Sequence, residues 1–280
     1  GKKCNVNLQI TGENELRTGG IRVPDSSVLT VVGDGNLTIN LNSGKYFGIG
    51  NSLDEYHGEL NFYQDGGIII NANGMKGIGI GSGLGGVINI KRGHYEFDMK
   101  GQEGACIGSV NGDSELFIEY CDMDIYSGIS NGTIIGSVNG DADIKLENIS
   151  AKLQGAGNVI TGIGTIAGNS CMVRLENVNI SSNIRAKECY GIGCRAGRTD
   201  IYIGYAAVKS VVQGKSAVAF GNSVMSAKLY CSNADVGTNA VTEFNSDIGA
   251  LEKNIQLENG RAEFILNGQE VKRQILAARL

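Results

Sequence analysis

A row of aromatic and charged residues recurs at intervals of about 28 positions and is the part of this chain best suited to binding another molecule. Its members are Phe117, Lys145, Arg174, Tyr202 and Tyr230, and two positions after the first three come Glu119, Glu147 and Glu176. Aromatic rings offer apolar contact area, and carboxylates accept hydrogen bonds from hydroxyls or amines. Side by side, these residues would bind an extended glycan or protein segment. The alternative is a solvated sheet face with ion pairs worth under about 1 kcal/mol each.

Asp122 and Asp124 come nearest to a catalytic pair of carboxylates. In a strand they would share a face about 7 Å apart, within the roughly 6.5–9.5 Å used by inverting glycosidases. No neighbouring repeat has such a pair, and no nearby basic residue suggests itself, so we interpret this segment as a polar corner. The two histidines, His57 and His94, have no triad-like neighbours and are expected at corners or on the surface. We therefore predict no catalytic residue and a chain that is not an enzyme.

Two glycine-rich segments match phosphate-binding motifs by their letters alone. Residues 81–86 read Gly-Ser-Gly-Leu-Gly-Gly, but no helix follows, as a dinucleotide site would require. Residues 214–216 read Gly-Lys-Ser, but position 209, where a phosphate loop needs glycine, is Lys209. We interpret both segments as corners and predict no cofactor.

Seven cysteines are present, namely Cys4, Cys106, Cys121, Cys171, Cys189, Cys194 and Cys231. Their odd number and differing positions in the repeat argue against a disulfide framework. Unpaired thiols favour a reducing compartment, which would be cytoplasmic. Cys189 and Cys194 lie close together but lack a second ligand pair, so we predict no metal site. Cys121 and Cys231 occupy inward positions and are expected to be buried.

Composition excludes several partners. The net charge is −5, and no basic stripe is present, so nucleic-acid binding through this chain is not expected. No run of 18 apolar residues occurs, so we expect no membrane insertion. Hydrophobic residues make up 41% of the chain, enough for a continuous core, and 43 glycines against one proline indicate many tight corners.

The candidate residues are positioned by a repeat built around a Gly-Ile-Gly phrase. Its glycines are Gly50, Gly81, Gly108, Gly136, Gly164, Gly193, Gly221 and Gly249. A fixed period near 28 residues indicates stacked identical units. Eight and ten positions after most of these glycines an apolar residue recurs, which is the alternation of a half-buried strand. An Asn, Asp or Gly then breaks the strand before a second alternating run, and the phrase itself forms a third.

We therefore predict an all-β fold, a single-stranded parallel β-helix or solenoid of about nine rungs with three short strands each. Right-handed connections are the default. Residues 1–270 would form the solenoid, with an N-terminal cap over 1–19, rungs over 20–260 and a C-terminal hairpin over 261–270 with an Asn-Gly turn. Residues 271–280 would be a short helical tail or a linker. One rung places Val173 and Leu175 a residue late, which suggests a bulge.

Several segments resemble repeats in large bacterial β-helix proteins of gut Firmicutes. They are residues 21–24 (Ile-Arg-Val-Pro), residues 28–37 (Val-Leu-Thr-Val-Val-Gly-Asp-Gly-Asn-Leu) and the Gly-Ile-Gly-Ser phrase with its Asn-Gly corner. The resemblance covers about residues 8–260. It implies a parallel β-helix and an adhesin-like or carbohydrate-binding surface module, and a cell-surface or extracellular location that the cysteines oppose.

Three functions follow as hypotheses. The first is a non-catalytic binding or adhesion module that presents a long sheet face to a glycan or a protein. The second is a ligand-sensing or assembly domain of a larger intracellular regulatory protein. The third is a carbohydrate-active lyase or hydrolase, which some parallel β-helices are, although the required acids are missing here.

Overall fold

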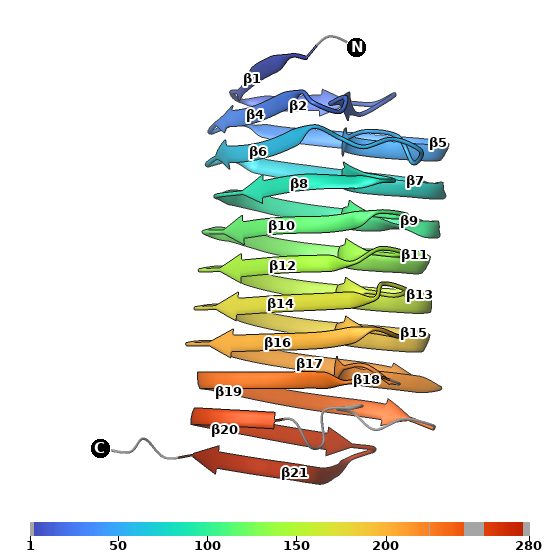
Figure 1. Cartoon of the computed structure of the whole chain (residues 1–280). Helices are drawn as coiled ribbons and strands as arrows, with labels where there is room; N and C mark the ends of the chain where they lie inside the picture. Colours follow the sequence, from blue (N-terminus) through green and yellow to red (C-terminus); the bar gives the residue numbers. More distant parts are fainter. Residues whose placement is uncertain (1–2, 224, 244–254, 277–280) are drawn as a thin grey trace.

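The computed structural model describes residues 3–223, 225–243 and 255–276, and these form a parallel β-solenoid of about eight turns (Figure 1). No helix occurs among the described residues. The strands are β1 (Asn5–Ile10), β2 (Glu13–Leu16), β3 (Ile21–Arg22), β4 (Val28–Gly33), β5 (Asn36–Gly50), β6 (Glu59–Gln64), β7 (Gly67–Ser82), β8 (Gly85–Ile90), β9 (Gly93–Ser109), β10 (Asp113–Glu119), β11 (Cys121–Ser137), β12 (Ala142–Glu147), β13 (Ser150–Thr165), β14 (Ser170–Glu176), β15 (Asn179–Cys194), β16 (Arg198–Gly204), β17 (Ala207–Gly214), β18 (Ser216–Gly221), β19 (Ala227–Thr242), β20 (Ile255–Leu266) and β21 (Gln269–Leu276).

Each turn of the middle rungs consists of a short strand and a long one. β10 has 7 residues and β11 has 17, and β11 contains both the second and the third predicted strand. β10 pairs in parallel with β8 and β12, while β11 pairs with β9 and β13. The predicted β-helix is therefore confirmed, with the last two runs of each rung joined into one extended strand.

The core is a column of aliphatic side chains that alternation points inward. Leu116 and Ile118 of β10 stack on Ile144 and Leu146 of β12, and all four are buried. One cluster of this kind runs from Ile10 to Phe264. Because each rung contacts only its neighbours, the same inward pattern must recur in every turn.

The Gly-Ile-Gly-Ser phrase forms a corner in which neighbouring rungs approach closely. Gly136 has a φ of 132°, and a Cβ there would lie 1.9 Å from the carbonyl oxygen of Gly164 on the next rung. The buried hydroxyl of Ser137 donates to the carbonyl oxygen of Gly112 at 2.7 Å and accepts from the backbone N–H of Gly140 at 2.8 Å. Glycine thus permits the close approach, and the following hydroxyl pairs backbone groups that water cannot reach.

Three details differ from expectation. β12 and β14 pair without interruption, so there is no bulge; the extra residue lies in the turn before β14, where the N–H groups of Asn169 and Ser170 both donate to Asp141. Residues 271–276 form a strand rather than a helix, paired antiparallel with β20 across the predicted Asn267-Gly268 turn. The hairpin therefore extends past residue 270, and residues 277–280 lie outside the described residues. By pairing with β20, these residues provide backbone hydrogen-bond partners for a strand edge that a helix would have left unpaired.

Candidate functional site

The predicted row forms one continuous column on the outer face of the short strands. Phe117 pairs with Lys145, Lys145 with Arg174, Arg174 with Tyr202, and Tyr202 with Tyr230. Glu119, Glu147 and Glu176 form a parallel column beside it. The two outer columns are therefore arranged as the sequence predicts, although their use in binding is a separate matter.

In the charged half of these columns, which we define as Phe117, Lys145, Arg174, Glu119 and Glu147, long side chains pair with one another. Lys145 donates to Glu147 at 2.6 Å, and this hydrogen bond raises the pKa of Lys145. Arg174 pairs with Asp143 at 2.6 Å. Glu119 pairs with Lys91 on the preceding rung. The charged side chains of this half are therefore already paired with oppositely charged groups of the protein.

In the aromatic half, which we define as Tyr202, Tyr230, Glu176, Gly204 and Ser232, the columns are different. The two tyrosine rings stack with centroids 4.9 Å apart and planes 7° from parallel. Each ring therefore covers one face of the other, and the pair presents ring edges and hydroxyls outward. The apolar contact area of this pair is therefore smaller than that of two separate rings.

A hollow of about 380 Å³ lies beside the tyrosine stack. Its lining comprises Glu176, Tyr202, Ile203, Gly204, Tyr230, Cys231, Ser232, Gln256, Leu257 and Glu258. A Cβ at Gly204 would lie 2.2 Å from Oε2 of Glu176, so this carboxylate extends over the glycine backbone. Gly204, Ser232 and Glu258 are not among the residues predicted from the sequence. The available signal was the interruption of the glutamate column by two small residues.

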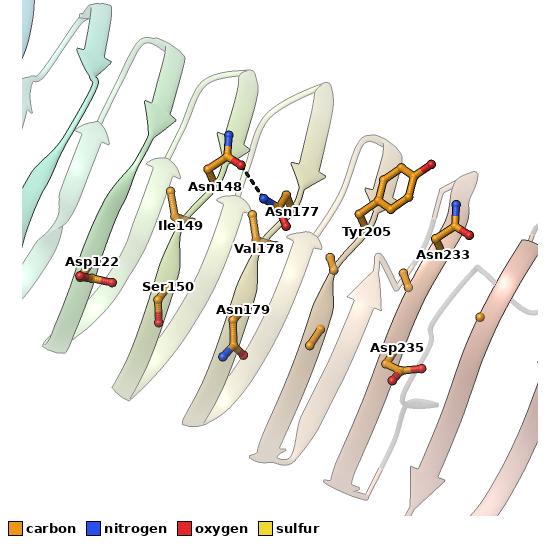
Figure 2. A pocket seen from close by; sticks show the side chains of 14 residues that line it. Asp122, Asn148, Ile149, Ser150, Asn177, Val178, Asn179, Tyr205, Asn233 and Asp235 are labelled. Atoms are coloured by element: carbon orange, nitrogen blue, oxygen red, sulfur yellow. Dashed lines mark hydrogen bonds between the residues drawn. The ribbon is translucent and has the colours of Figure 1, made fainter.

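A corner ridge, formed at the turn after each short strand, borders this hollow beside Gly204, and Figure 2 shows four of its members, Asn148, Asn177, Tyr205 and Asn233. Its members are Tyr120, Asn148, Asn177, Tyr205, Asn233 and Asn259, and all have positive φ between 47° and 53°. The backbone N–H groups of Tyr120, Asn148, Asn177 and Tyr205 donate to the next rung; that of Tyr205, for example, donates to the carbonyl oxygen of Ser232 at 3.0 Å. Asn177 also donates from its side chain to Asn148 at 2.5 Å. The ridge is thus a ladder of equivalent left-handed residues.

A polar groove of about 710 Å³ runs along the other side of the ridge. The side chains of Asp122, Ser150, Asn179 and Asp235 form its second wall, while Ile149 and Val178 lie between the two walls (Figure 2). Ala206, Ala207, Ala234 and Gly260 complete it. Small residues leave this groove open in the later rungs, and its polar groups are amides, hydroxyls and carboxylates.

The other candidates for chemistry are separated or paired. Asp122 lines the groove, whereas Asp124 is held by Lys152 on the next rung at 3.1 Å. His94 is exposed, as expected, but His57 is buried against Gly86, where a Cβ would come within 2.6 Å of the ring. Burial lowers the pKa of His57 to about 4. The surface role allowed for His57 is therefore wrong, although it does sit at a corner.

Most of the thiols are buried, so they are poorly placed to act as nucleophiles or metal ligands. Cys4 is exposed and the other six cysteines are buried without disulfides. Cys121 and Cys231 are buried among the core side chains, which confirms their predicted inward positions, and this burial raises their pKa values to about 12. Within the described residues, no group of three or more His, Cys, Asp or Glu side chains is arranged to hold a metal ion.

Comparisons with protein-family models, with curated proteins and with solved structures found no match to this chain. Across the part of the chain that the structure describes, no helix has the length and apolarity needed to cross a membrane. The geometry and chemistry of the described surface are therefore the basis for a function.

Proposed function

We propose that this chain is a non-catalytic binding module that holds an extended ligand, a glycan or a protein segment, along the outer face of its short strands. The observation that carries the proposal is the hollow beside the Tyr202–Tyr230 stack, flanked by the carboxylates of Glu176 and Glu258. Apolar ring edges next to a few convergent polar groups are the usual composition of a ligand site.

The solenoid suits long ligands because equivalent positions recur on every rung at about 4.8 Å. Contacts of modest strength then add along the ligand without a deep pocket. An adhesin-like role on a bacterial cell surface is the specific form of this proposal, and it rests on the resemblance of the repeats.

Affinity measurements on a paired-tyrosine variant test the proposal. Glycan and peptide arrays supply the ligand, and calorimetry compares the parent chain with Tyr202→Ala/Tyr230→Ala. We expect affinity to fall at least tenfold while the variant stays folded, since both side chains point outward. Tyr56→Ala, at an exposed tyrosine in the turn before β6 and away from the outer face of the short strands, is the matched control and should bind as the parent does. Unchanged affinity of the double variant would sink the proposal.

A second candidate is a sensing or assembly domain of an intracellular regulatory protein. It is favoured by the six buried, unpaired thiols, because reduced cysteines at this density are typical of reducing compartments. Thiol titration of protein isolated from its native cells should count seven free groups under this candidate. Disulfide-linked material would instead favour the extracellular module.

A further inference from the structure

We infer that the corner ridge is the track for a neutral, extended β-linked glycan, with Tyr205 and Tyr120 as the rings on which its sugars pack. The inference rests on the proposed binding function but places the ligand on different residues. It deepens that function by naming the ligand class and the contacts.

The backbone of the ridge gives the first argument. Asn148, Asn177 and Asn233 have φ values of 53°, 51° and 51°, and asparagine tolerates this left-handed conformation well. Tyr205 and Tyr120, at 47° and 53°, occupy the same position with a bulky side chain that disfavours it. Adjacent rungs adopt the same backbone conformation with asparagine at this position, so the fold does not require tyrosine there. Strained residues of this kind concentrate at functional sites.

Exposure gives the second argument. Tyr205 is 64% exposed and Tyr120 is 61% exposed, the two highest values among the exposed large hydrophobic residues of the described chain. Both tyrosines thus combine high exposure with a left-handed backbone conformation that disfavours a bulky side chain. The stacked Tyr202 is only 40% exposed, and Tyr230 covers one of its ring faces. A ring that is to pack on a sugar needs a free face, which the ridge tyrosines are better placed to offer.

The surroundings of Tyr205 supply hydrogen-bonding groups on both sides. Towards the groove stand the amides of Asn177, Asn179 and Asn233 (Figure 2). Towards the hollow stand Glu176 and Glu258. Amides both donate and accept, and carboxylates accept, so together they match sugar hydroxyls, which do both.

The charges of the residues that line the groove and the hollow restrict the kind of glycan that could bind. Asp122 and Asp235 line the groove, and Glu176 and Glu258 line the hollow, whereas neither cavity has a basic residue in its lining. A polymer of uronic acids or sulfated sugars would be repelled by these four carboxylates. The lining therefore favours a neutral glycan over an anionic one.

Spacing separates a glycan from a peptide. Tyr120 and Tyr205 are three rungs apart, or roughly 14 Å at about 4.8 Å per rung. Pyranose units of an extended β-1,4-linked glycan each advance by close to one rung, and successive units alternate the face they present, so sugars three units apart would pack on the two rings with opposite faces. An extended peptide advances by about 3.3 Å per residue and alternates its side chains, so it drifts out of register with the ridge.

The test uses substitutions that neighbouring rungs already contain. Tyr205→Asn and Tyr120→Asn restore the residue found at Asn148 and Asn177, so both variants should fold and should resist heat at least as well as the parent. The probes are cellohexaose, xylohexaose and laminarihexaose as neutral β-linked glycans, a hexagalacturonate as the anionic glycan and a lysine-rich decapeptide. Calorimetry measures each affinity. Tyr63→Asn is the control for loss of an exposed tyrosine elsewhere.

We expect at least one neutral hexasaccharide to bind, each ridge variant to weaken it about tenfold, and the control to leave it unchanged. Failure of all three neutral glycans to bind overturns the inference, as does preference for the peptide or the galacturonate. If a glycan binds and only Tyr202→Ala/Tyr230→Ala weakens it, the ridge assignment is wrong while the proposed function stands. If the ridge variants alone weaken it, the ligand lies on the ridge and the sheet-face version of the proposed function fails.

Discussion

On β10, β12 and β14 the outer column holds Phe117, Lys145 and Arg174, whereas on β16 and β19 it holds Tyr202 and Tyr230. The hydrogen-bonded register continues unbroken from one half to the other. In the charged half, ion pairs join side chains within and between rungs. In the aromatic half, Gly204 and Ser232 leave a hollow beside the ring stack. A repeat backbone thus sets where side chains stand, and a few small residues decide whether a face is filled or open.

If the charged and aromatic halves have the same corner geometry, replacing the equivalent corner glycine should lower the free energy of unfolding equally in both. Gly136 and Gly193 each have a positive φ, and a Cβ would lie 1.9 Å from Gly164 O and 2.1 Å from Gly221 O, respectively. Because rigid backbone is the obstacle, Gly136→Ala and Gly193→Ala should each lower the free energy of unfolding by about 4 kcal/mol or more. Urea unfolding followed by circular dichroism measures this loss.

Gly237→Ala is the matched control, because a Cβ there meets no atom within 4 Å. Its unfolding free energy should change by less than about 1 kcal/mol. A large loss for one phrase glycine and a small loss for the other would show that the two halves do not share the same corner geometry.

A pH titration tests whether the buried histidine makes the fold sensitive to acid. His57 has a folded pKa of about 4, below its unfolded value of about 6.5, so folding favours its neutral form. This stability is fully present above pH 6.5 and is lost as the pH falls towards 4, by about 3 kcal/mol. Unfolding free energies measured across this window should show the loss.

His57→Gln should remove most of this slope, whereas His94→Gln, at an exposed ring, should retain it. If His57→Gln keeps the parent slope, the buried histidine is not the source of the acid sensitivity.

The interior was predictable from the sequence, and the hollow was not. Alternation is a local property, so Leu116 and Ile118 could be assigned inward without knowing what stacks on them. The repeat places Glu176, Gly204 and Ser232 in one column, but the hollow depends on how the side chains around the two small residues are oriented, and the register alone does not give those orientations. Small residues also carry little signal, because a gap is visible only once its walls are in place.

The C-terminal tail shows a different limit. Its apolar residues at Val271, Ile275 and Leu276 suit a helix by their spacing, yet residues 271–276 form a strand paired with β20. The decision is made by an open edge that must be covered, which is a property of the assembled solenoid. The bulge suggested near Val173 failed for a similar reason, since the turn beside Asp141 absorbed the extra residue.

Filling the hollow should make the aromatic half behave like the charged half. Ser232→Arg places a long cation between Glu176 and Glu258, where it can form ion pairs. Stability should change by less than about 0.5 kcal/mol, since the site is at the surface. Affinity for a ligand of the sheet face should fall about tenfold, or about 1.4 kcal/mol. Calorimetry measures the affinity, and Ser181→Arg, at an exposed serine of β15, is the control for an added cation elsewhere. Full binding by Ser232→Arg would show that the hollow is not used.

The smallest expected effect concerns the contacts that distinguish the two halves. Double-mutant cycles isolate the coupling between two side chains from their separate contributions. For Tyr202 and Tyr230, stacked at 4.9 Å, the coupling should be about 0.5–1.5 kcal/mol, as for other aromatic pairs. For Lys145 and Glu147, 45% and 30% exposed, water weakens the attraction and the coupling should be about 0.2–1 kcal/mol. Raising the salt concentration should reduce the second coupling and leave the first unchanged, because screening acts on charges alone. An ion pair that couples more strongly than the ring stack, and that resists salt, would mean that the charged half is the better-ordered face and the stronger candidate for binding.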